Sequence, residues 1–438
     1  MASQPSSRTP LSSILPPLIF GTATFNTQYN KDPYALDTKG LVKEALDHGV
    51  RAFDTSPYYG PAEILLGAAL DVPDIRARYA RREYFILTKV GRIAAEEFDY
   101  SPEWVRSSVD RSLERLKTDY LDVVYCHDVE FVSEEEVLGA VKELRRLRDE
   151  ERKVKYIGIS GYPVDVLCSL AARVLRETGE PLDAVMSYAN FTLQNTLLET
   201  QAIPLLKQAG VDVVPNASML GMGLLRHDGQ PEGAQGDWHP SPLGLRRAVQ
   251  DASDFCDRHD ERIEVIAIRY ALESYVTVGS IVGSSGDPAS GVPWKEESID
   301  DVGGGKLGVS VMGVSNSAEL KKTMQVWRSI LDGLEGGEAT AMAAGRWRRD
   351  HEWSLNRKKA VQILADGVKE VMDKWLDFTW ESPHRDYVNV RGKTTEQVYE
   401  AKEKLRASAL KQVTVAAMWP TPAASPEPVS EDRRFPFR

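Results

Sequence analysis

The sequence predicts a (β/α)8 TIM barrel, in which eight parallel strands are surrounded by helices. Short runs rich in β-branched and aromatic residues alternate with longer amphipathic segments, and this alternation predicts a parallel sheet. Eight runs qualify as strands, and eight is the number that closes such a barrel. The expected strands are Leu18–Gly21, Arg51–Asp54, Tyr84–Val90, Leu121–His127, Tyr156–Ser160, Ala184–Tyr188, Val211–Ser218 and Val309–Val314.

The helical segments between the strands carry start and stop signals. Thr38–His48 is followed by Gly49, and Leu197–Ala209 by Gly210; glycine is a frequent helix stop. Pro102–Leu116 follows a serine that can act as N-cap, and it has proline at its first position. The other expected helices are Glu134–Glu150, Val164–Glu177, Gly244–Arg258 and Arg262–Leu272.

We expect the barrel to occupy residues 15–333, with a loop insertion at 283–308 and a helical extension at 334–419. Gly303 to Lys306 lacks the preceding strand and the spacing of a phosphate loop, so a surface insertion is favoured. The extension contains several tryptophans and a helix, Leu355–Leu376, whose apolar face has to pack on something. We expect it to pack on the barrel, with a dimer surface or a substrate lid as alternatives. Residues 1–14 and 420–438 are expected to be flexible tails.

Composition excludes some partners. The chain has 438 residues, of which 42% are hydrophobic and 27% charged, as is usual for soluble globular proteins. A net charge of −11 argues against nucleic acid or an anionic membrane as partner. The basic cluster at 142–155 is interleaved with acids, which favours a solvated helix face. Three cysteines without metal-ligand spacing predict no metal site and a cytoplasmic location. No apolar run approaches the ~18 residues of a membrane helix, and the oligomeric state is left open.

Four polar residues lie at or near the ends of successive predicted strands: Asp54, Tyr59, Lys89 and His127. A free tyrosine titrates near pH ~10, and a neighbouring lysine ammonium lowers that value by stabilising the phenolate. An aspartate can hold the lysine, and a histidine can donate to a carbonyl oxygen. Taken singly, each residue is more often structural. As a set they predict proton transfer while another agent moves a hydride.

Longer motifs accompany this set. They include Asp54-Thr55-Ser56-Pro57-Tyr58-Tyr59-Gly60, Leu66-Gly67-Ala68-Ala69-Leu70 and Ser112-Leu113-Glu114-Arg115-Leu116. Over residues ~15–330 the chain resembles the aldo-keto reductase family. The stretches Asn216–Leu225 and Gly313–Asn316 resemble its aldose 1-dehydrogenase branch of L-galactose and fungal D-arabinose dehydrogenases.

The resemblance implies a role for each catalytic candidate. Tyr59 would be the general acid/base, Lys89 the partner that lowers its pKa, Asp54 the anchor of Lys89, and His127 the group that orients the reacting oxygen. Tyr58 also offers a hydroxyl, but the family register places the catalytic tyrosine five positions after the aspartate, which selects Tyr59.

The resemblance also implies a nicotinamide dinucleotide across the barrel mouth. Ser160 and Gly161 occupy the carboxamide position, where Ser-Asn is commoner, and Asn190 is a candidate replacement for the missing asparagine. Ala217 stands where relatives often have an aromatic stacker. The remaining cofactor candidates are Gly21 and Thr22 after strand one, Ser218, Leu220 and Gly223 after strand seven, and Gly313, Ser315 and Asn316, which begin the last helix and suit a phosphate.

Glu319 lies near the position where NADP-preferring relatives commonly have an arginine. A carboxylate repels a 2′-phosphate and can accept from a 2′-hydroxyl, so NAD is favoured. Lys321 and Lys322 keep NADP as a minority option.

These residues predict an oxidoreductase that oxidises the anomeric carbon of an aldose, such as D-arabinose or L-galactose, to the aldonolactone with NAD. An NADPH-dependent aldehyde or ketone reductase is the first alternative. A nucleotide-binding sensor or scaffold, resembling potassium-channel β subunits, is the second, and an intact catalytic set argues against it.

Overall fold

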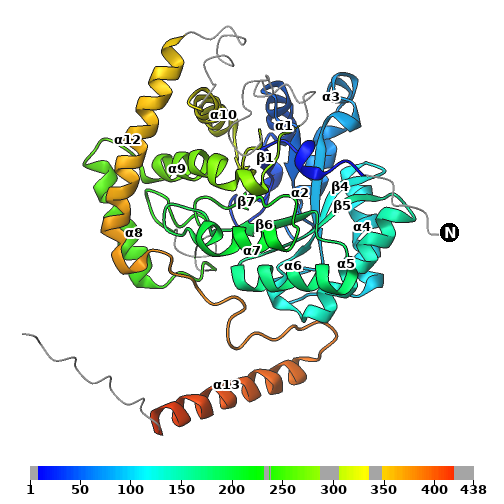
Figure 1. Cartoon of the computed structure of the whole chain (residues 1–438). Helices are drawn as coiled ribbons and strands as arrows, with labels where there is room; N and C mark the ends of the chain where they lie inside the picture. Colours follow the sequence, from blue (N-terminus) through cyan, green and yellow to red (C-terminus); the bar gives the residue numbers. More distant parts are fainter. Residues whose placement is uncertain (1–7, 231–235, 237, 287–304, 335–347, 419–438) are drawn as a thin grey trace, which may run out of the picture. The chain divides into compact units, whose positions relative to one another are not determined.

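The computed structural model describes residues 8–230, 236, 238–286, 305–334 and 348–418. Its eight strands pair in parallel in chain order, and the last pairs with the first, so the sheet closes into a barrel with helices around it (Figure 1). The predicted (β/α)8 fold is confirmed. The strands are β1 (Leu18–Gly21), β2 (Ala52–Asp54), β3 (Phe85–Val90), β4 (Leu121–His127), β5 (Val154–Gly161), β6 (Ala184–Tyr188), β7 (Asn216–Ala217) and β8 (Ser310–Gly313).

The helices lie outside the strands, and two of them, α2 and α3, are absent from the sequence prediction. Ser101 caps α4 by accepting from the Trp104 amide at 3.3 Å, as its position in the sequence predicts. The helices are α1 (Thr38–Asp47), α2 (Ala62–Leu70), α3 (Pro73–Arg78), α4 (Pro102–Leu116), α5 (Glu134–Asp149), α6 (Val164–Thr178), α7 (Ile203–Gln208), α8 (Leu243–Asp257), α9 (Ile263–Val278), α10 (Ser317–Asp332), α12 (Arg348–Met372) and α13 (Thr395–Met418).

Two elements are much shorter than predicted, and proline explains both. β7 has only two residues because Pro215 has no N–H for the ladder, although Val213 still forms an isolated parallel bridge to Ala184. The helix predicted at Leu197–Ala209 starts as a π-turn, Leu198–Ala202, and the regular helix α7 begins only around Pro204.

The motif residues outside the catalytic set hold α2 against α4. Glu63 is buried and accepts from the hydroxyls of Thr88 and Ser112, both at 2.7 Å. A Cβ on Gly67 would lie 2.0 Å from the Arg115 carbonyl oxygen, so only glycine permits this close approach of the two helices. These residues serve the fold.

The N-terminal end of the barrel is closed by residues expected to be flexible. Residues 1–7 lie outside the described residues, but Leu11 and Leu15 are fully buried among the interior side chains of the strands. Ser12 also accepts from Ser284 and Ser285, where Ser284 pairs with Leu307 across the base of the insertion. The expectation for 8–14 was therefore wrong, because their apolar side chains fill the open end of the barrel. Most of the insertion, 287–304, lies outside the described residues.

Helix α12 packs on α8 and α9 beside the barrel (Figure 1). Val361, Ala365, Val368 and Met372 are buried in one apolar cluster with residues of α8 and α9. The compact unit that contains the barrel ends at Pro383, and a second unit begins at His384 and contains α13. The division at 333 and the single extension 334–419 stay a prediction, and 335–347 lie outside the described residues.

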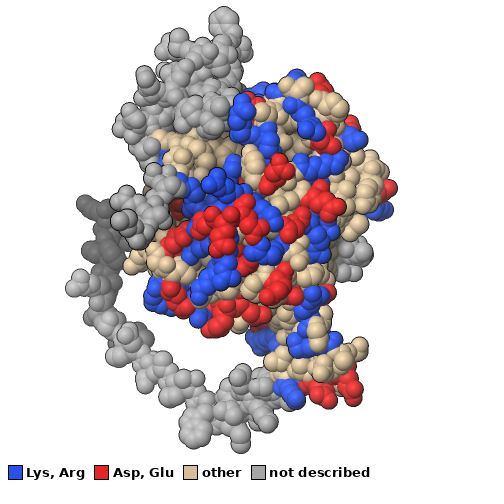
Figure 2. Space-filling view, turned by 90° about the vertical axis from the view of Figure 1, so that its right-hand side faces the viewer, with Lys and Arg blue, Asp and Glu red and all other residues tan. Residues whose placement is uncertain are grey.

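Charged side chains of both signs interleave over the face that Figure 2 shows. Arg106 of α4 contacts Glu143 of α5 at 2.6 Å, and Lys153 of the basic cluster contacts Asp110 at 2.7 Å. Within the basic cluster, Arg145, Arg146, Arg148, Lys153 and Lys155 pair with nearby carboxylates.

One segment, Ile263–Val282, is long and apolar enough to pass as a membrane span by length and composition, which the sequence analysis did not anticipate. Its most apolar stretch is 67% buried within the protein, because α9 packs against α8, α10 and α12. It is weak evidence for a membrane, since core helices pass the same test. The cytoplasmic location stays a prediction.

Candidate active site

The carboxyl ends of the strands bring the predicted polar residues together. Asp54 pairs in register with Leu87, so Lys89 lies two residues further along on the same side of the sheet. Lys89 in turn pairs with Tyr125, which places His127 two residues beyond. Because side chains alternate along a strand, all three face the barrel interior near its mouth.

Lys89 and Asp54 form a buried ion pair. The Lys89 Nζ lies 2.7 Å and 2.9 Å from the two carboxylate oxygens of Asp54, and it also donates to the Thr55 carbonyl at 2.9 Å. Lys89 is only 2% exposed. Burial alone would lower its pKa, but Asp54 and Tyr59 outweigh that effect and raise the pKa of Lys89, so it stays charged. A buried lysine held in this way is a fixed cation.

That cation acts on Tyr59, which follows β2. The Lys89 Nζ lies 4.8 Å from the centre of the Tyr59 ring. Burial raises the pKa of Tyr59 and Lys89 lowers it, with burial the larger effect. Tyr59 is half-buried, and the surrounding protein desolvates its hydroxyl. Lys89 thus acts in the predicted direction on the pKa of Tyr59, and burial, which the sequence does not reveal, acts against it and is the larger effect.

His127 is oriented by Ser56. The Ser56 Oγ accepts from the Tyr58 amide at 3.1 Å and lies 3.1 Å from His127 Nδ1, so its own hydrogen is free to donate to Nδ1. That tautomer places the ring hydrogen on Nε2. Burial lowers the pKa of His127 to about 3. His127 is therefore neutral, and its ring meets that of Tyr59 edge to face at 5.8 Å.

Tyr58 is tied to a second group of charges, absent from the sequence prediction, which also reaches His127, because Asp128 Oδ2 lies 3.6 Å from His127 Nε2 and the Tyr58 ring meets the His127 ring at 5.9 Å. Arg92 donates to the Tyr58 hydroxyl at 3.1 Å, covers its ring at 3.9 Å, and pairs with the buried Asp128. Arg92 comes two residues after β3 and Asp128 directly follows β4. Their positions just past strand ends were a signal that could have found them.

The cofactor candidates at β1 and β8 lie side by side, since Gly21 pairs with Gly313. Thr22 is buried, and its hydroxyl donates to the Asp54 carbonyl at 3.0 Å. Its side chain therefore ties β1 to β2.

The candidates after β5 and β6 are closely packed. Ser160 pairs in register with His127 and is buried near it. The side-chain amide of Asn190 donates hydrogen bonds to the Tyr162 carbonyl at 2.6 Å and to the Ser187 hydroxyl at 2.9 Å. Gly161 faces Glu130, whose Oε2 would lie 2.6 Å from a Cβ at that position. The cofactor role of these residues stays a prediction.

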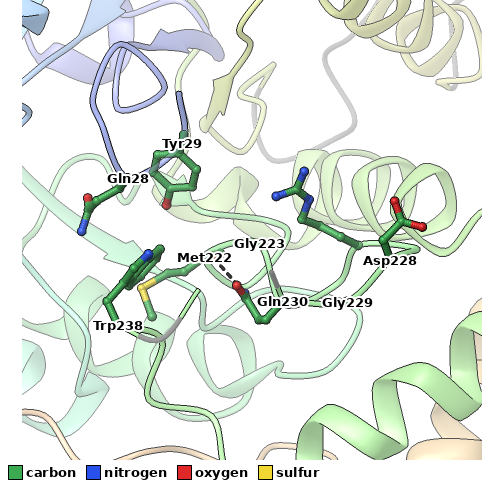
Figure 3. Close-up of a pocket in the computed structure, with 9 residues that line it drawn as sticks. Gln28, Tyr29, Met222, Gly223, Asp228, Gly229, Gln230 and Trp238 are labelled. Atoms are coloured by element: carbon green, nitrogen blue, oxygen red, sulfur yellow. Dashed lines mark hydrogen bonds between the residues drawn. The ribbon is translucent and has the colours of Figure 1, made fainter. Parts of the chain in front are cut away.

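A cavity of about 220 Å³ lies between the loops that follow β1 and β7. In Figure 3, Gln28 and Tyr29 lie opposite Met222 and Trp238. Of the candidates after β7, Gly223 lines this cavity, Leu220 packs in the apolar cluster of α12, and Ser218 accepts from the Met222 amide at 2.8 Å. The residues that line the cavity are Gln28, Tyr29, Met222, Gly223, Arg226, Asp228, Gly229, Gln230 and Trp238.

The start of α10 is occupied by the protein's own groups. Asn316 caps the helix by accepting from the Glu319 amide at 3.0 Å, and the Glu319 carboxylate accepts from the Ser315 amide at 2.7 Å. A negative charge is thus already placed at the helix N-terminus, where the helix dipole favours it. Lys321 pairs with Glu44 at 3.2 Å.

The fold and this cluster define an enzyme of the aldo/keto reductase class. The model of the Aldo/keto reductase family matches residues 17–333, so the chain belongs to that family and is an NAD(P)-dependent oxidoreductase. It is 44% identical over 268 residues to D-arabinose 1-dehydrogenase of Saccharomyces cerevisiae, covering 61% of this chain and 78% of that protein. It is 38% identical over 255 residues to L-galactose dehydrogenase of Arabidopsis thaliana, covering 57% and 74%. It is also 27% identical over 271 residues to D-threo-aldose 1-dehydrogenase of a Pseudomonas species, covering 56% and 78%.

Proposed function

We propose that this protein is an NAD-dependent aldose 1-dehydrogenase that oxidises the anomeric carbon of a D-arabinose- or L-galactose-type sugar to the aldonolactone. The main support for this proposal is the cluster at the barrel mouth, in which a buried Lys89–Asp54 pair lies beside Tyr59 and a neutral His127. Relatives named as dehydrogenases of D-arabinose, L-galactose and D-threo-aldoses support the sugar class.

The residues at the mouth fit a nicotinamide dinucleotide. Arg226 supplies a cation to the cavity, Gln28 and Gln230 supply amides, and Gly223 and Gly229 line it without side chains. The cation and the glycines suit a pyrophosphate, which needs positive charge and close backbone approach, whereas the carboxylate of Asp228, which also lines the cavity, opposes it. The catalytic candidates do not line this cavity, but Tyr29 in its wall interacts electrostatically with Tyr59. When bound, the cofactor supplies the acceptor for a hydride.

The chain's own groups would handle the proton. Tyr59, once deprotonated, takes the proton of the C1 hydroxyl while the C1 hydrogen leaves with its electron pair and a C1=O bond forms. Lys89 stabilises the phenolate by charge, and Asp54 keeps Lys89 in place. His127 donates from Nε2 to the C1 oxygen and orients it, as its hydrogen bond to Ser56 prepares it to do. Because burial raises the pKa of Tyr59, oxidation should speed up as the pH rises.

The preference for NAD over NADP is proposed from the start of α10. The Glu319 carboxylate lies there on the Ser315 amide, and a 2′-phosphate brought to the same place would meet a like charge. Lys321, which could favour NADP, is paired with Glu44.

A steady-state screen of pentoses and hexoses with NAD and with NADP tests the proposal. We expect a D-arabinose- or L-galactose-type sugar to give the highest kcat/KM with NAD, and the product to be the lactone. A preference for NADP of about tenfold or more, roughly 1.4 kcal/mol, would overturn the cofactor assignment. Turnover of simple aldehydes or ketones with NADPH, without sugar oxidation, would favour the reductase alternative.

A further inference from the structure

Glu130 is a buried carboxyl group that the proposed mechanism does not use. It lies in the 3₁₀ turn Val129–Phe131, three residues after His127. Part of the side chain reaches the surface, but its Oε2 is buried and has no hydrogen-bond partner among the described residues. An orphaned buried oxygen is costly, so its retention calls for a reason.

The other oxygen of Glu130 joins two distant parts of the chain. Oε1 accepts from the Tyr162 backbone amide at 3.2 Å and from the Ser382 hydroxyl at 3.0 Å. Tyr162 directly follows the Ser160–Gly161 end of β5. Ser382 lies beyond residues 17–333, which the family model matches. Glu130 therefore connects the end of β5 to a segment outside the family's barrel.

Gly161 is what admits this carboxyl. A Cβ at position 161 would lie 2.6 Å from Oε2 and 3.4 Å from Leu167, although the backbone of Gly161 has no positive φ that would itself require glycine. The departure from Ser-Asn thus makes room for Glu130.

The same C-terminal segment holds Tyr162 from a second side. The Trp380 ring stacks on the Tyr162 ring, with centroids 4.7 Å apart and planes at 4°. Trp380 also meets His239 edge to face at 5.1 Å, and it packs with Ala189 and Met222. Met222 lines the cavity described above, so the segment contacts the loops around the proposed cofactor site.

The surroundings of Glu130 favour its neutral, protonated form. Burial, and then the nearby Asp128, raise the pKa of Glu130 to about 8. The titratable groups that contact it or act on it are Asp128, Tyr100, Tyr162 and Tyr188, and Asp128 is itself paired with the cation Arg92. A neutral carboxyl can accept from Tyr162 and Ser382 without burying a charge.

We propose that Glu130 is a positioning residue that sets the end of β5, and with it Ser160, for the nicotinamide end of the cofactor. It acts through the Tyr162 amide and is braced by Ser382, with Gly161 providing the space. This inference rests on the proposed function only in assuming that a nicotinamide dinucleotide binds beside Ser160.

The test is the affinity of the full chain for NADH, measured by fluorescence titration at pH 7. Glu130→Gln keeps a neutral acceptor for both donors and should bind NADH within about twofold of the wild type, whereas Glu130→Ala should bind about tenfold more weakly. Glu135→Ala is the matched control, since the side chain of Glu135 is 73% exposed. Above pH 8 the wild type should lose affinity relative to Glu130→Gln.

A double-mutant cycle separates positioning from general damage. Gly161→Ala should weaken NADH binding by crowding Oε2, and adding Glu130→Ala should cost less than the two single effects combined. If Glu130→Ala does not fold, Ser382→Ala, which removes one donor, replaces it with a smaller expected loss. Equal impairment of Glu130→Gln and Glu130→Ala, or wild-type affinity in Glu130→Ala, would overturn the inference.

These outcomes are distinct from failure of the proposed function. If the variants show the expected NADH affinities but the protein oxidises no sugar, the inference about Glu130 stands and the sugar assignment is wrong. A wild-type chain that binds no NADH would overturn both.

Discussion

Two acidic side chains near the barrel mouth, Asp54 and Glu130, differ in their partners. Asp54 ends β2 and receives two hydrogen bonds from the Lys89 ammonium on the next strand. Glu130 lies in the turn after β4, the charge that acts most on its pKa is that of another acid, Asp128, and one of its oxygens has no hydrogen-bond partner among the described residues. Burial raises the pKa of both carboxyl groups, and at Asp54 the Lys89 ammonium counteracts that effect, whereas at Glu130 the neighbouring Asp128 adds to it. The difference lies in the charge of the neighbour that each carboxyl group has.

The largest expected effect comes from removing the group that the ion pair serves. Tyr59→Phe should lower kcat for sugar oxidation by ~10²–10⁴, the usual contribution of a general acid or base, and leave NADH affinity nearly unchanged. Tyr58→Phe is the control and should keep most activity, because the Tyr58 hydroxyl pairs with Arg92. An inactive Tyr58→Phe beside an active Tyr59→Phe would show that the assignment is reversed.

Breaking the ion pair tests the charged half of the comparison directly. Lys89→Met should destabilise the protein by about 3–5 kcal/mol, because it leaves Asp54 buried without its cation. It should also shift the alkaline rise of the pH–rate profile to higher pH, since Lys89 lowers the pKa of Tyr59. Adding Asp54→Asn should restore much of the stability but not the activity. Chemical denaturation and pH–rate measurements check the two effects, and a profile that stays in place would contradict the role of Lys89.

The second site depends on a segment that follows α12, so the attachment of α12 can be tested separately. Met372 is fully buried against α8 and α9, whereas Ile363 on the same helix is 71% exposed. Met372→Ala should cost about 2–5 kcal/mol in unfolding free energy. Ile363→Ala is its control and should change stability by at most about 0.5 kcal/mol. Equal effects would mean that α12 does not pack as an integral part of the barrel unit.

A third carboxylate, Glu319, extends the comparison to an exposed site at a helix N-terminus. Glu319→Arg should shift the ratio of kcat/KM toward NADP by roughly 1–2 kcal/mol, the scale of a charge-assisted hydrogen bond. Glu319→Gln is the intermediate control, which removes the repulsion without adding a cation. If neither variant changes the ratio, residues other than Glu319 distinguish the 2′-hydroxyl of NAD from the 2′-phosphate of NADP.

The last effect is the pH dependence of stability caused by Glu130. Its pKa in the folded protein is about 8, above its ordinary value of 4.5, so between these values the unfolded chain releases a proton that the folded chain keeps. The stabilisation is complete below the ordinary value and is lost as the pH rises toward 8. Relative to Glu130→Gln, the wild type should therefore lose stability from about pH 5 to pH 8, measured by denaturation across this range. Parallel curves for the two proteins would show that Glu130 is ionised at neutral pH.

Much of the fold could be predicted because its signals are local. The strand ends at Asp54 and His127 coincide with the predicted ends, and α4 has its predicted bounds. Misses arose where a local pattern competed with something else. Pro215 shortened β7. Leu11 and Leu15 pack against the interior side chains at one end of the barrel, and no local pattern predicts that contact.

The sequence by itself determined which catalytic candidates meet, because alternation along strands and closure of a parallel barrel place Asp54, Lys89 and His127 on one side. Only the tertiary structure decided their electrostatics: that burial raises the pKa of Tyr59 despite Lys89, and that His127 is neutral. It alone also brought Ser382 to Glu130 across 252 positions of the chain. Desolvation and long-range contacts depend on how every element packs, and no window of sequence contains that information.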